Sequence, residues 1–368
     1  MFQNLQDAHL LNYVLIVGFS VLISLFAIPS ILHVAAKRHL YDDLGHFRKQ
    51  HDHGIPRLGG VAIFLSFTIT SLLCCSTDNP LPINYLLTAC IILFGMGLKD
   101  DLSGVNPSTK FIIQFFVCAI LVIPGDIRLT SMYGVFGIYE LPYAFSIGLS
   151  VVTIMMIINA FNLVDGIDGL AAITGIIANV AFAILFYYID QYELAAISLA
   201  IVGAMIGFLR FNLTPAKIFM GDTGSLLVGL ISAVMAVKFI EVNKFVEGAK
   251  SPEIFSAPAL SVAILIIPIF DTLRVFFIRL ASGSSPFKAD RNHLHHRILT
   301  LGFNHLQTTL LLGGINILAV ILALEFSAYG NTVLLLLIGT LLIMFNWVIT
   351  FCIRSKERET FALRNLFV

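Results

Sequence analysis

The chain has 368 residues, of which 58% are hydrophobic and 12% are charged, whereas roughly a quarter of the residues of a soluble domain are charged. Its formal net charge is zero and its mean hydropathy is +0.92. This composition excludes a soluble domain, and without a basic excess we expect no nucleic-acid partner.

The sequence predicts an all-α, polytopic integral membrane protein with about eleven transmembrane helices in a single domain, residues 1–368. The first apolar run is longer than a signal-peptide core, so we expect it to be retained. The run after Lys110 is the weakest, because it needs Ser108–Lys110 to complete its first turn. The predicted helices cover residues 12–35, 58–75, 81–98, 109–124, 143–161, 170–189, 192–209, 224–240, 257–280, 308–326 and 331–353.

The charge distribution predicts the orientation of these helices. All but four of the 22 Lys and Arg residues fall in or beside the loops on one side of the membrane. The positive-inside rule therefore predicts an outside N-terminus and an inside C-terminus. The outside segment Gly125–Pro142 alternates apolar and polar residues around Tyr133-Gly134, which predicts a small extracytoplasmic hairpin. The inside loops that would form the active site cover residues 39–57, 99–110, 159–169, 210–223 and 282–307.

Two adjacent carboxylates, Asp100 and Asp101, follow the predicted end of a helix. Adjacent carboxylates repel one another, so one would hold its proton more readily unless a cation is near. Lys110 re-enters the membrane beside them if the next helix begins near Pro107. We interpret the three as a candidate catalytic group, although an Asp-Asp dipeptide also occurs in ordinary solvated loops.

The motif in the loop at 159–169 is the strongest in the chain. Asn162, Asp165 and Asp168 recur every three residues, so on a helix or tight helical turn they would share a face. Their oxygens suit Mg²⁺ or Mn²⁺, and the interleaved glycines Gly166 and Gly169 would let a nucleotide or diphosphate lie against bare backbone. The alternative, an Asx turn between two helices, needs only one Asp-Gly.

Asp222 lies in the motif Phe219-Met220-Gly221-Asp222, just before the predicted helix 224–240. It could cap that helix, or it could bind a metal beside a phosphate at the helix N-terminus. The two roles are compatible.

Histidines and cations crowd the last inside loop, which contains Arg291, His293, His295, His296 and Arg297. Two phosphates would balance their charges and accept their hydrogen bonds. A zinc site is the alternative, but the histidines form no helical i, i+4 pair and no Cys is nearby.

Asp271 and Arg274 lie one turn apart inside the predicted helix 257–280, where isolated charges are costly. They form either an ion pair with each other or part of the wall of the site.

In this order, the motifs resemble those of the polyprenyl-phosphate N-acetylhexosamine-1-phosphate transferases, from about Arg48 to Arg297. The His-x-His-His pattern is more similar to the WecA and teichoic-linkage branch than to the branch that makes the peptidoglycan lipid, which has three consecutive histidines. The motifs that carry the resemblance are Arg48-Lys49-x-His51, Pro56-Arg57-x-Gly59-Gly60, Asp100-Asp101, Asn162-x-x-Asp165-Gly-x-Asp168-Gly169, Phe219-Met220-Gly221-Asp222, Asp271-Thr272 and His293-x-His295-His296.

The resemblance implies that undecaprenyl phosphate attacks the β-phosphorus of a UDP-N-acetylhexosamine, commonly UDP-GlcNAc in this branch. UMP is released, and the lipid-diphosphate sugar starts the synthesis of a surface polysaccharide. The resemblance also implies Mg²⁺, an active site on the cytoplasmic face of the bacterial inner membrane and, often, a homodimer.

Residue roles follow from the same resemblance. Asn162 and Asp222 would hold the metal, and Lys110 would contact the diphosphate. Asp100 or Asp101 would act as base or as covalent nucleophile. Asp165 would join the catalytic group, and Asp168 would face the uridine. The other substrate-binding residues would be Lys49, Arg57, Arg274, Arg291, His293, His295 and His296.

A transporter or flippase is the main alternative function, because Asp271 and Arg274 could form a path inside the membrane. The acidic motifs, however, are predicted on one side and not near the midplane, and no internal repeat is present. A second alternative, a CDP-alcohol phosphotransferase, needs Asp-Gly-x-x-Ala-Arg, whereas Asp165-Gly166 is followed by Ile167-Asp168-Gly169.

Overall fold

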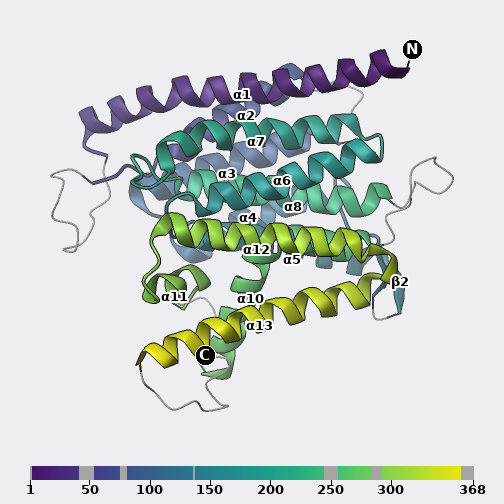
Figure 1. The fold of residues 1–368 in the computed structure, drawn as a ribbon. Helices are drawn as coiled ribbons and strands as arrows, with labels where there is room; N and C mark the ends of the chain where they lie inside the picture. The colour runs from purple at the N-terminus through teal and green to yellow at the C-terminus, as the bar shows by residue number, and fades with distance from the viewer. Residues whose placement is uncertain are drawn as a thin grey trace.

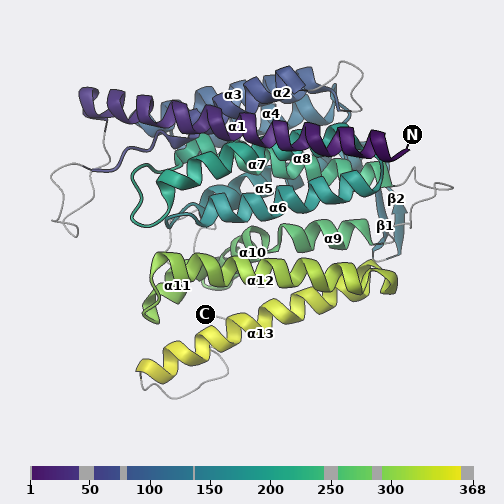
Figure 2. The same cartoon turned by 45° about the horizontal axis from the view of Figure 1, so that its top comes forward.

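The computed structural model describes residues 2–40, 54–74, 81–135, 137–243, 256–283 and 292–357. These residues form a bundle in which α1 (Phe2–Arg38) lies along one edge and α13 (Asn331–Glu357) along the opposite edge (Figures 1 and 2). The helices between them are α2 (Gly59–Cys74), α3 (Ile83–Ser103), α4 (Pro107–Val122), α5 (Tyr143–Val164), α6 (Leu170–Tyr188), α7 (Tyr192–Asn212), α8 (Gly221–Val242), α9 (Ala257–Ile264), α10 (Ile266–Ala281), α11 (Leu294–Thr300) and α12 (His305–Glu325), with a 3₁₀ turn η2 (Ser327–Tyr329).

The predicted all-α class is confirmed. Within the described part of the chain, eight helices are long and apolar enough to cross a membrane, and the bent pair α9–α10 could count as a ninth. The apolar helices α2 and α4 have 16 residues each, which gives about 24 Å against a hydrocarbon core of about 30 Å. The number of eleven spans therefore stays a prediction.

The predicted helix 257–280 is in fact two helices, which meet at Leu265 with a bend of 81°. Pro268 explains the break, because a proline has no N–H for the carbonyl four residues earlier and its ring clashes with that carbonyl. The freed carbonyl of Ile264 accepts a hydrogen bond from Nδ2 of Asn316 in α12 at 3.0 Å. A side chain of a neighbouring helix thus supplies the partner that the helix lost.

The almost fully buried helix α8 is the centre of the bundle, and α2, α3, α5 and α6 pack around it. Glycines allow the closest of these contacts. A Cβ atom built on Gly60 of α2 would lie 2.1 Å from the backbone nitrogen of Gly224 in α8. The starts of α2 and α8 therefore touch through their backbones.

The predicted hairpin is confirmed by the antiparallel strands β1 (Ser131–Val135) and β2 (Ile138–Glu140). The turn follows Val135, however, so the Tyr133-Gly134 pair lies within β1 and not at the turn. Thr130 just before β1 donates its N–H and hydroxyl to the Glu241 carboxylate, at 2.8 and 2.7 Å. This contact ties the hairpin to the C-terminal end of α8, at the opposite end of the bundle from α11 (Figure 1).

Candidate active site

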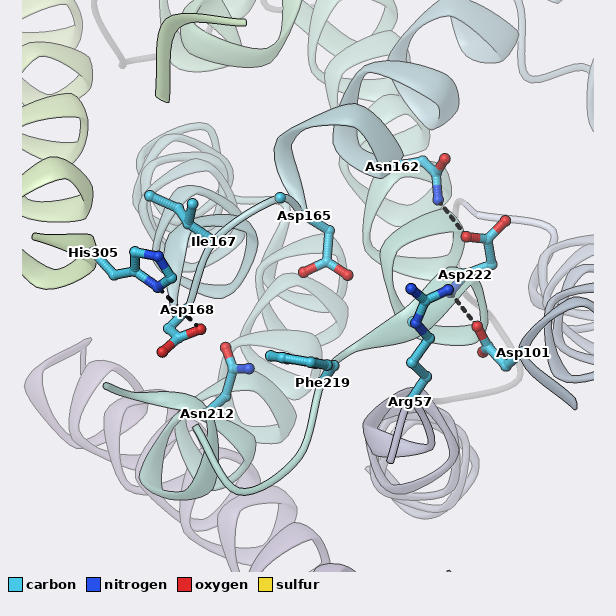
Figure 3. A pocket seen from close by; sticks show the side chains of 12 residues that line it. Arg57, Asp101, Asn162, Asp165, Ile167, Asp168, Asn212, Phe219, Asp222 and His305 are labelled. Carbon is cyan, nitrogen blue, oxygen red and sulfur yellow. Dashed lines mark hydrogen bonds and ion pairs between the residues drawn. The ribbon is translucent and has the colours of Figure 1, made fainter. Parts of the chain in front are cut away.

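The acidic motifs meet at the end of the bundle where α3, α5 and α7 end and α4, α6, α8 and α12 begin. A cavity of about 450 Å³ opens there (Figure 3). For the described residues, the prediction that these motifs gather at one place is confirmed. The cavity is lined by Arg57, Asp101, Asn162, Asp165, Gly166, Ile167, Asp168, Asn212, Phe219, Gly221, Asp222 and His305.

Two segments far apart in the sequence pair through their backbones to form one wall of the cavity. The N–H of Phe219 donates to the carbonyl of Pro56, and the N–H of Gly59 donates back to the carbonyl of Phe219, both at 2.9 Å. Gly221 follows with a φ of +70°, and a Cβ there would lie 2.4 Å from the carbonyl oxygen of Arg57. Glycine is therefore required at this position. The pairing places Arg57 and Phe219 on the cavity wall (Figure 3).

Asp101 caps a helix other than its own. The helix α3 continues to Ser103, so Asp100 and Asp101 lie in its last turn and not beyond its end as predicted. Oδ1 of Asp101 accepts the N–H of Asp222 at 2.8 Å, and Oδ2 accepts the N–H and hydroxyl of Thr223 at 2.9 and 2.5 Å. These N–H groups belong to the first turn of α8, where no earlier residue of the helix can bind them.

The interpretation of Asp222 as a helix cap is therefore wrong. The helix α8 begins at Gly221 and not at residue 224, so Asp222 lies inside the first turn and its carboxylate is directed elsewhere. Nζ of Lys110 lies 2.7 Å from Oδ2 of both Asp222 and Asp100. On the other side, Nδ2 of Asn162 donates to Oδ1 of Asp222 at 2.8 Å. Asp222 is thus fixed from both sides at the cavity wall, and Lys110 joins it to Asp100.

Carboxylate oxygens in this cluster fit a hard divalent cation. One oxygen each of Asp100, Asp101 and Asp222 lie within 4.8 Å of one another. Mg²⁺ and Mn²⁺ prefer such oxygens and commonly take one or two carboxylates together with substrate phosphates. The oxygens of Asp101 already accept three hydrogen bonds, and Asp100 is not among the residues that line the cavity, so Asp222 is the best-placed ligand. Asn162 presents its amide nitrogen to Asp222, so its oxygen would become a ligand only with the amide turned over.

Asp165 directly follows α5 and points into the middle of the cavity (Figure 3). Burial raises the pKa of this carboxyl well above its ordinary value, and the charges of Asp222 and Asp101 add to the effect. The amide of Gly221 and the charge of Arg57 oppose that rise. Asp165 is therefore a carboxylate that accepts a proton readily.

Asp168 lies at the other end of the cavity, beside Asn212 and His305 (Figure 3). The helix α5 ends at Val164, so Asn162, Asp165 and Asp168 share a cavity but not one helical face, contrary to the prediction. His305 and Asn212 were not among the predicted site residues. The sequence could have placed His305 in the first turn of a helix, because Asn304 and Gln307 have the spacing of a capping box.

Asp271 and Arg274 form the predicted ion pair, with Nη2 of Arg274 at 3.3 Å from Oδ1 of Asp271. The same carboxylate accepts the N–H of Leu294 at 2.9 Å and lies 3.0 Å from Nδ1 of His293. Asp271 therefore attaches α11 to α10. Nε and Nη1 of Arg274 have no hydrogen-bond partner among the described residues.

The three histidines at the start of α11 are not among the residues that line the cavity. His293 is buried against Asp271, and the ring of His295 packs against Gly166. Burial lowers the pKa of His295 to about 3, so its imidazole is neutral at pH 7. The half-buried His296 stacks at an angle on His295, and within the described residues no group of histidines is arranged to hold a metal. Phosphate binding by this motif stays a prediction.

Arg297 contacts α13 and not the cavity. It donates to Thr350 at 2.6 Å and to Asn346. Lys49 and Arg291 lie outside the described residues.

Comparison with known proteins gives relatives over most of the chain. Residues 83–240 match Glycosyl transferase family 4. The decaprenyl-phosphate N-acetylglucosaminephosphotransferase of Mycobacterium tuberculosis is 34% identical over 283 residues, which are 70% of this chain and 68% of that protein. The probable undecaprenyl-phosphate N-acetylglucosaminyl 1-phosphate transferase of Bacillus subtilis is 30% identical over 311 residues, 83% and 82% of the two chains. The undecaprenyl-phosphate alpha-N-acetylglucosaminyl 1-phosphate transferase of Escherichia coli K12 is 30% identical over 276 residues, 73% and 72%.

Proposed function

The chain belongs to glycosyl transferase family 4, and from this membership we propose that it transfers N-acetylglucosamine-1-phosphate from UDP-N-acetylglucosamine to undecaprenyl phosphate. An oxygen of the lipid phosphate attacks the β-phosphorus of the donor, and the bond from that phosphorus to the bridging oxygen breaks. UMP leaves with the bridging oxygen, and the lipid carries the diphosphate sugar. The observation that carries the proposal is the acidic cavity, in which Lys110 and Asn162 hold the Asp222 carboxylate at the wall.

We propose Mg²⁺ as the cofactor, with Mn²⁺ as its substitute, held by Asp222 and, with the amide turned over, by the oxygen of Asn162. The metal would neutralise charge that develops on the diphosphate. Lys110 keeps Asp222 and Asp100 together, and Asp101 positions the first turn of α8. Because three donors occupy the oxygens of Asp101, the geometry favours a positioning role for this residue over nucleophilic attack.

At the other end of the cavity, the groups suit the uridine of the donor. The Asp168 carboxylate can accept an N–H of the base, and Phe219 offers an aromatic face. The Asn212 amide holds the backbone around them, because its oxygen accepts the Gly169 N–H and its nitrogen donates to the Ile218 carbonyl, both at 2.9 Å. Arg57 lies between Asp101 and Asp165 and offers a cation to the diphosphate (Figure 3).

Asp165 would accept the proton of the lipid phosphate. Asp165→Asn cannot accept this proton, so we expect it to lower kcat for UMP release about a hundredfold.

In EDTA at pH 7.5 the same variant should melt at a higher temperature than the wild type, because it removes a buried charge that faces Asp222 and Asp101. A raised carboxyl pKa destabilises the fold above that pKa, so the difference should shrink as the pH falls and the wild-type carboxyl becomes protonated. Scanning calorimetry between pH 5 and 8 measures this, and a lower melting temperature of the variant throughout would contradict it.

The proposed topology has eleven spans, with α2, α4 and the bent pair α9–α10 completing the set, and the cavity on the cytoplasmic side. Exposed Ser103 at the cavity end and exposed Tyr139 on the hairpin are suitable reporters. In a variant that lacks the five native cysteines, Ser103→Cys should react with a membrane-impermeant maleimide only after permeabilisation, and Tyr139→Cys in intact cells. Labelling of Ser103→Cys in intact cells would overturn the orientation.

The activity is tested with purified protein, undecaprenyl phosphate, Mg²⁺ and a panel of UDP-sugars, with release of UMP as the measurement. We expect UDP-GlcNAc to be used and UDP-MurNAc-pentapeptide to be refused. Absence of UMP release with every donor, together with uptake of lipid-linked sugar by proteoliposomes, would favour the transporter alternative.

A further inference from the structure

His305 is a cavity residue without an assigned role. It is the first residue of α12, and 23% of its side chain is exposed. The capping box before it fixes its position, because Asn304 accepts the N–H of Gln307 at 2.8 Å and Gln307 accepts the N–H of Asn304 at 3.0 Å. The capping box therefore starts α12 at the cavity wall.

The same turn of α12 contacts Asp168 at two points. Nδ1 of His305 lies 3.2 Å from Oδ1 of Asp168, and the hydroxyl of Thr309, one turn later, donates to the main-chain carbonyl of Asp168 at 3.1 Å. Nδ1 is not aligned for a hydrogen bond with any described residue, so its interaction with the carboxylate is a close polar contact. Both the side chain and the backbone of Asp168 are thus fixed from α12.

These contacts determine the state of the Asp168 carboxylate. Burial alone would raise the pKa of this carboxyl, but His305 and the amide of Ala216 hold it below its ordinary value. The carboxylate is 5% exposed, and its Oδ2 accepts the Ala216 N–H at 3.3 Å. A buried carboxylate without such a partner would tend to take up a proton and lose its capacity as an acceptor.

We propose that His305 is a positioning residue for the nucleotide donor, which keeps Asp168 charged and correctly oriented to accept a hydrogen bond from the base. This inference rests on the proposed function, because it assumes that a uridine nucleotide occupies the Asp168 end of the cavity. Asp168 is 5% exposed, so it cannot rely on bulk water to stabilise its charge. His305 adds to the Ala216 N–H a compensating contact from a helix that begins 137 residues later in the chain.

The test compares His305→Ala, His305→Asn and Gln307→Ala, each alone and combined with Asp168→Asn. The kinetic constants are measured for both substrates, and the affinity for UDP is measured by calorimetry without acceptor. His305→Ala should raise the donor KM and weaken UDP binding about tenfold, while kcat and the acceptor KM change less than about twofold. His305→Asn keeps an N–H near the position of Nδ1 and should recover most of the affinity.

Two controls separate positioning from a loosened helix. Gln307→Ala removes the hydrogen bond to the Asn304 N–H, but the Asn304 side chain can still accept the backbone N–H at position 307, so α12 keeps its N-terminal cap and the donor KM should be unchanged. In the Asp168→Asn background, His305→Ala should have no further effect on the donor KM.

The inference is overturned if Gln307→Ala reproduces the change, if the effects of His305→Ala and Asp168→Asn add, or if UDP binds His305→Ala as tightly as the wild type. Calorimetry with UDP also separates the two proposals. A wild type that binds UDP but releases no UMP contradicts the proposed function alone, whereas an active wild type with unchanged UDP affinity in His305→Ala contradicts this inference alone.

Discussion

Asp222→Asn should lower kcat/KM for sugar-phosphate transfer about a thousandfold, the scale of losing a central electrostatic contact to the transition state. The substitution keeps the size of the side chain and removes the charge that Lys110 and the metal share. Lys110 retains its ion pair with Asp100, at 2.7 Å, so the cluster should not collapse. Initial rates of UMP release across a Mg²⁺ titration measure the effect, and added Mg²⁺ should not restore the rate.

The matched control is Glu325→Gln, which neutralises an exposed carboxyl at the C-terminal end of α12, away from the cavity. It should have wild-type kinetics. Asp222→Asn should retain the wild-type melting temperature within about 3 °C, since it loses contacts only at one partly exposed carboxylate. Activity of Asp222→Asn within tenfold of the wild type would remove Asp222 from the metal site.

Gly60→Ala should destabilise the protein by about 3 kcal/mol, the upper range for overpacking a tight contact. The new Cβ would lie 2.1 Å from N and 2.6 Å from Cα of Gly224, and backbone atoms cannot rotate away. The starts of α2 and α8 would have to separate, and the 2.9 Å hydrogen bond from Gly60 N–H to the Met220 carbonyl would lengthen. Because α8 also carries Asp222, we expect transfer to fall about a hundredfold, as for a 1 Å misplacement of a catalytic group.

Gly95→Ala is the control for this prediction, because Gly95 also lies inside a helix but has no atom within 4 Å of its Cβ position. Alanine there should be neutral or stabilise by up to about 1 kcal/mol, the difference in helix propensity between the two residues. Thermal unfolding in detergent measures both variants. Equal melting temperatures for Gly60→Ala and Gly95→Ala would show that the α2–α8 contact tolerates a methyl group.

The roles of the carboxylates show where sequence reasoning reached its limit. Asp100, Asp101 and Asp222 were correctly predicted to gather, because each lies in a turn of helix at the same end of the bundle. Which of them would cap a helix was not predictable, since Asp101 accepts the N–H groups of a residue 121 positions away. A cap within one helix is a local pattern, whereas a cap from a second helix depends on which helix ends touch.

Hydropathy alone predicted the all-α class and the approximate positions of the long helices, because burying a helix in a bilayer requires a continuous apolar run that can be read locally. Local turn signals also predicted the hairpin, although they misplaced its turn by putting it at Tyr133-Gly134, which lies within β1. Tertiary structure decided the rest. This includes the 81° bend at Leu265, the burial of His293 and His295, and the contact of His305 with Asp168. Burial and side-chain pairing depend on neighbours that are distant in sequence, so the pattern of residues along the chain does not specify them.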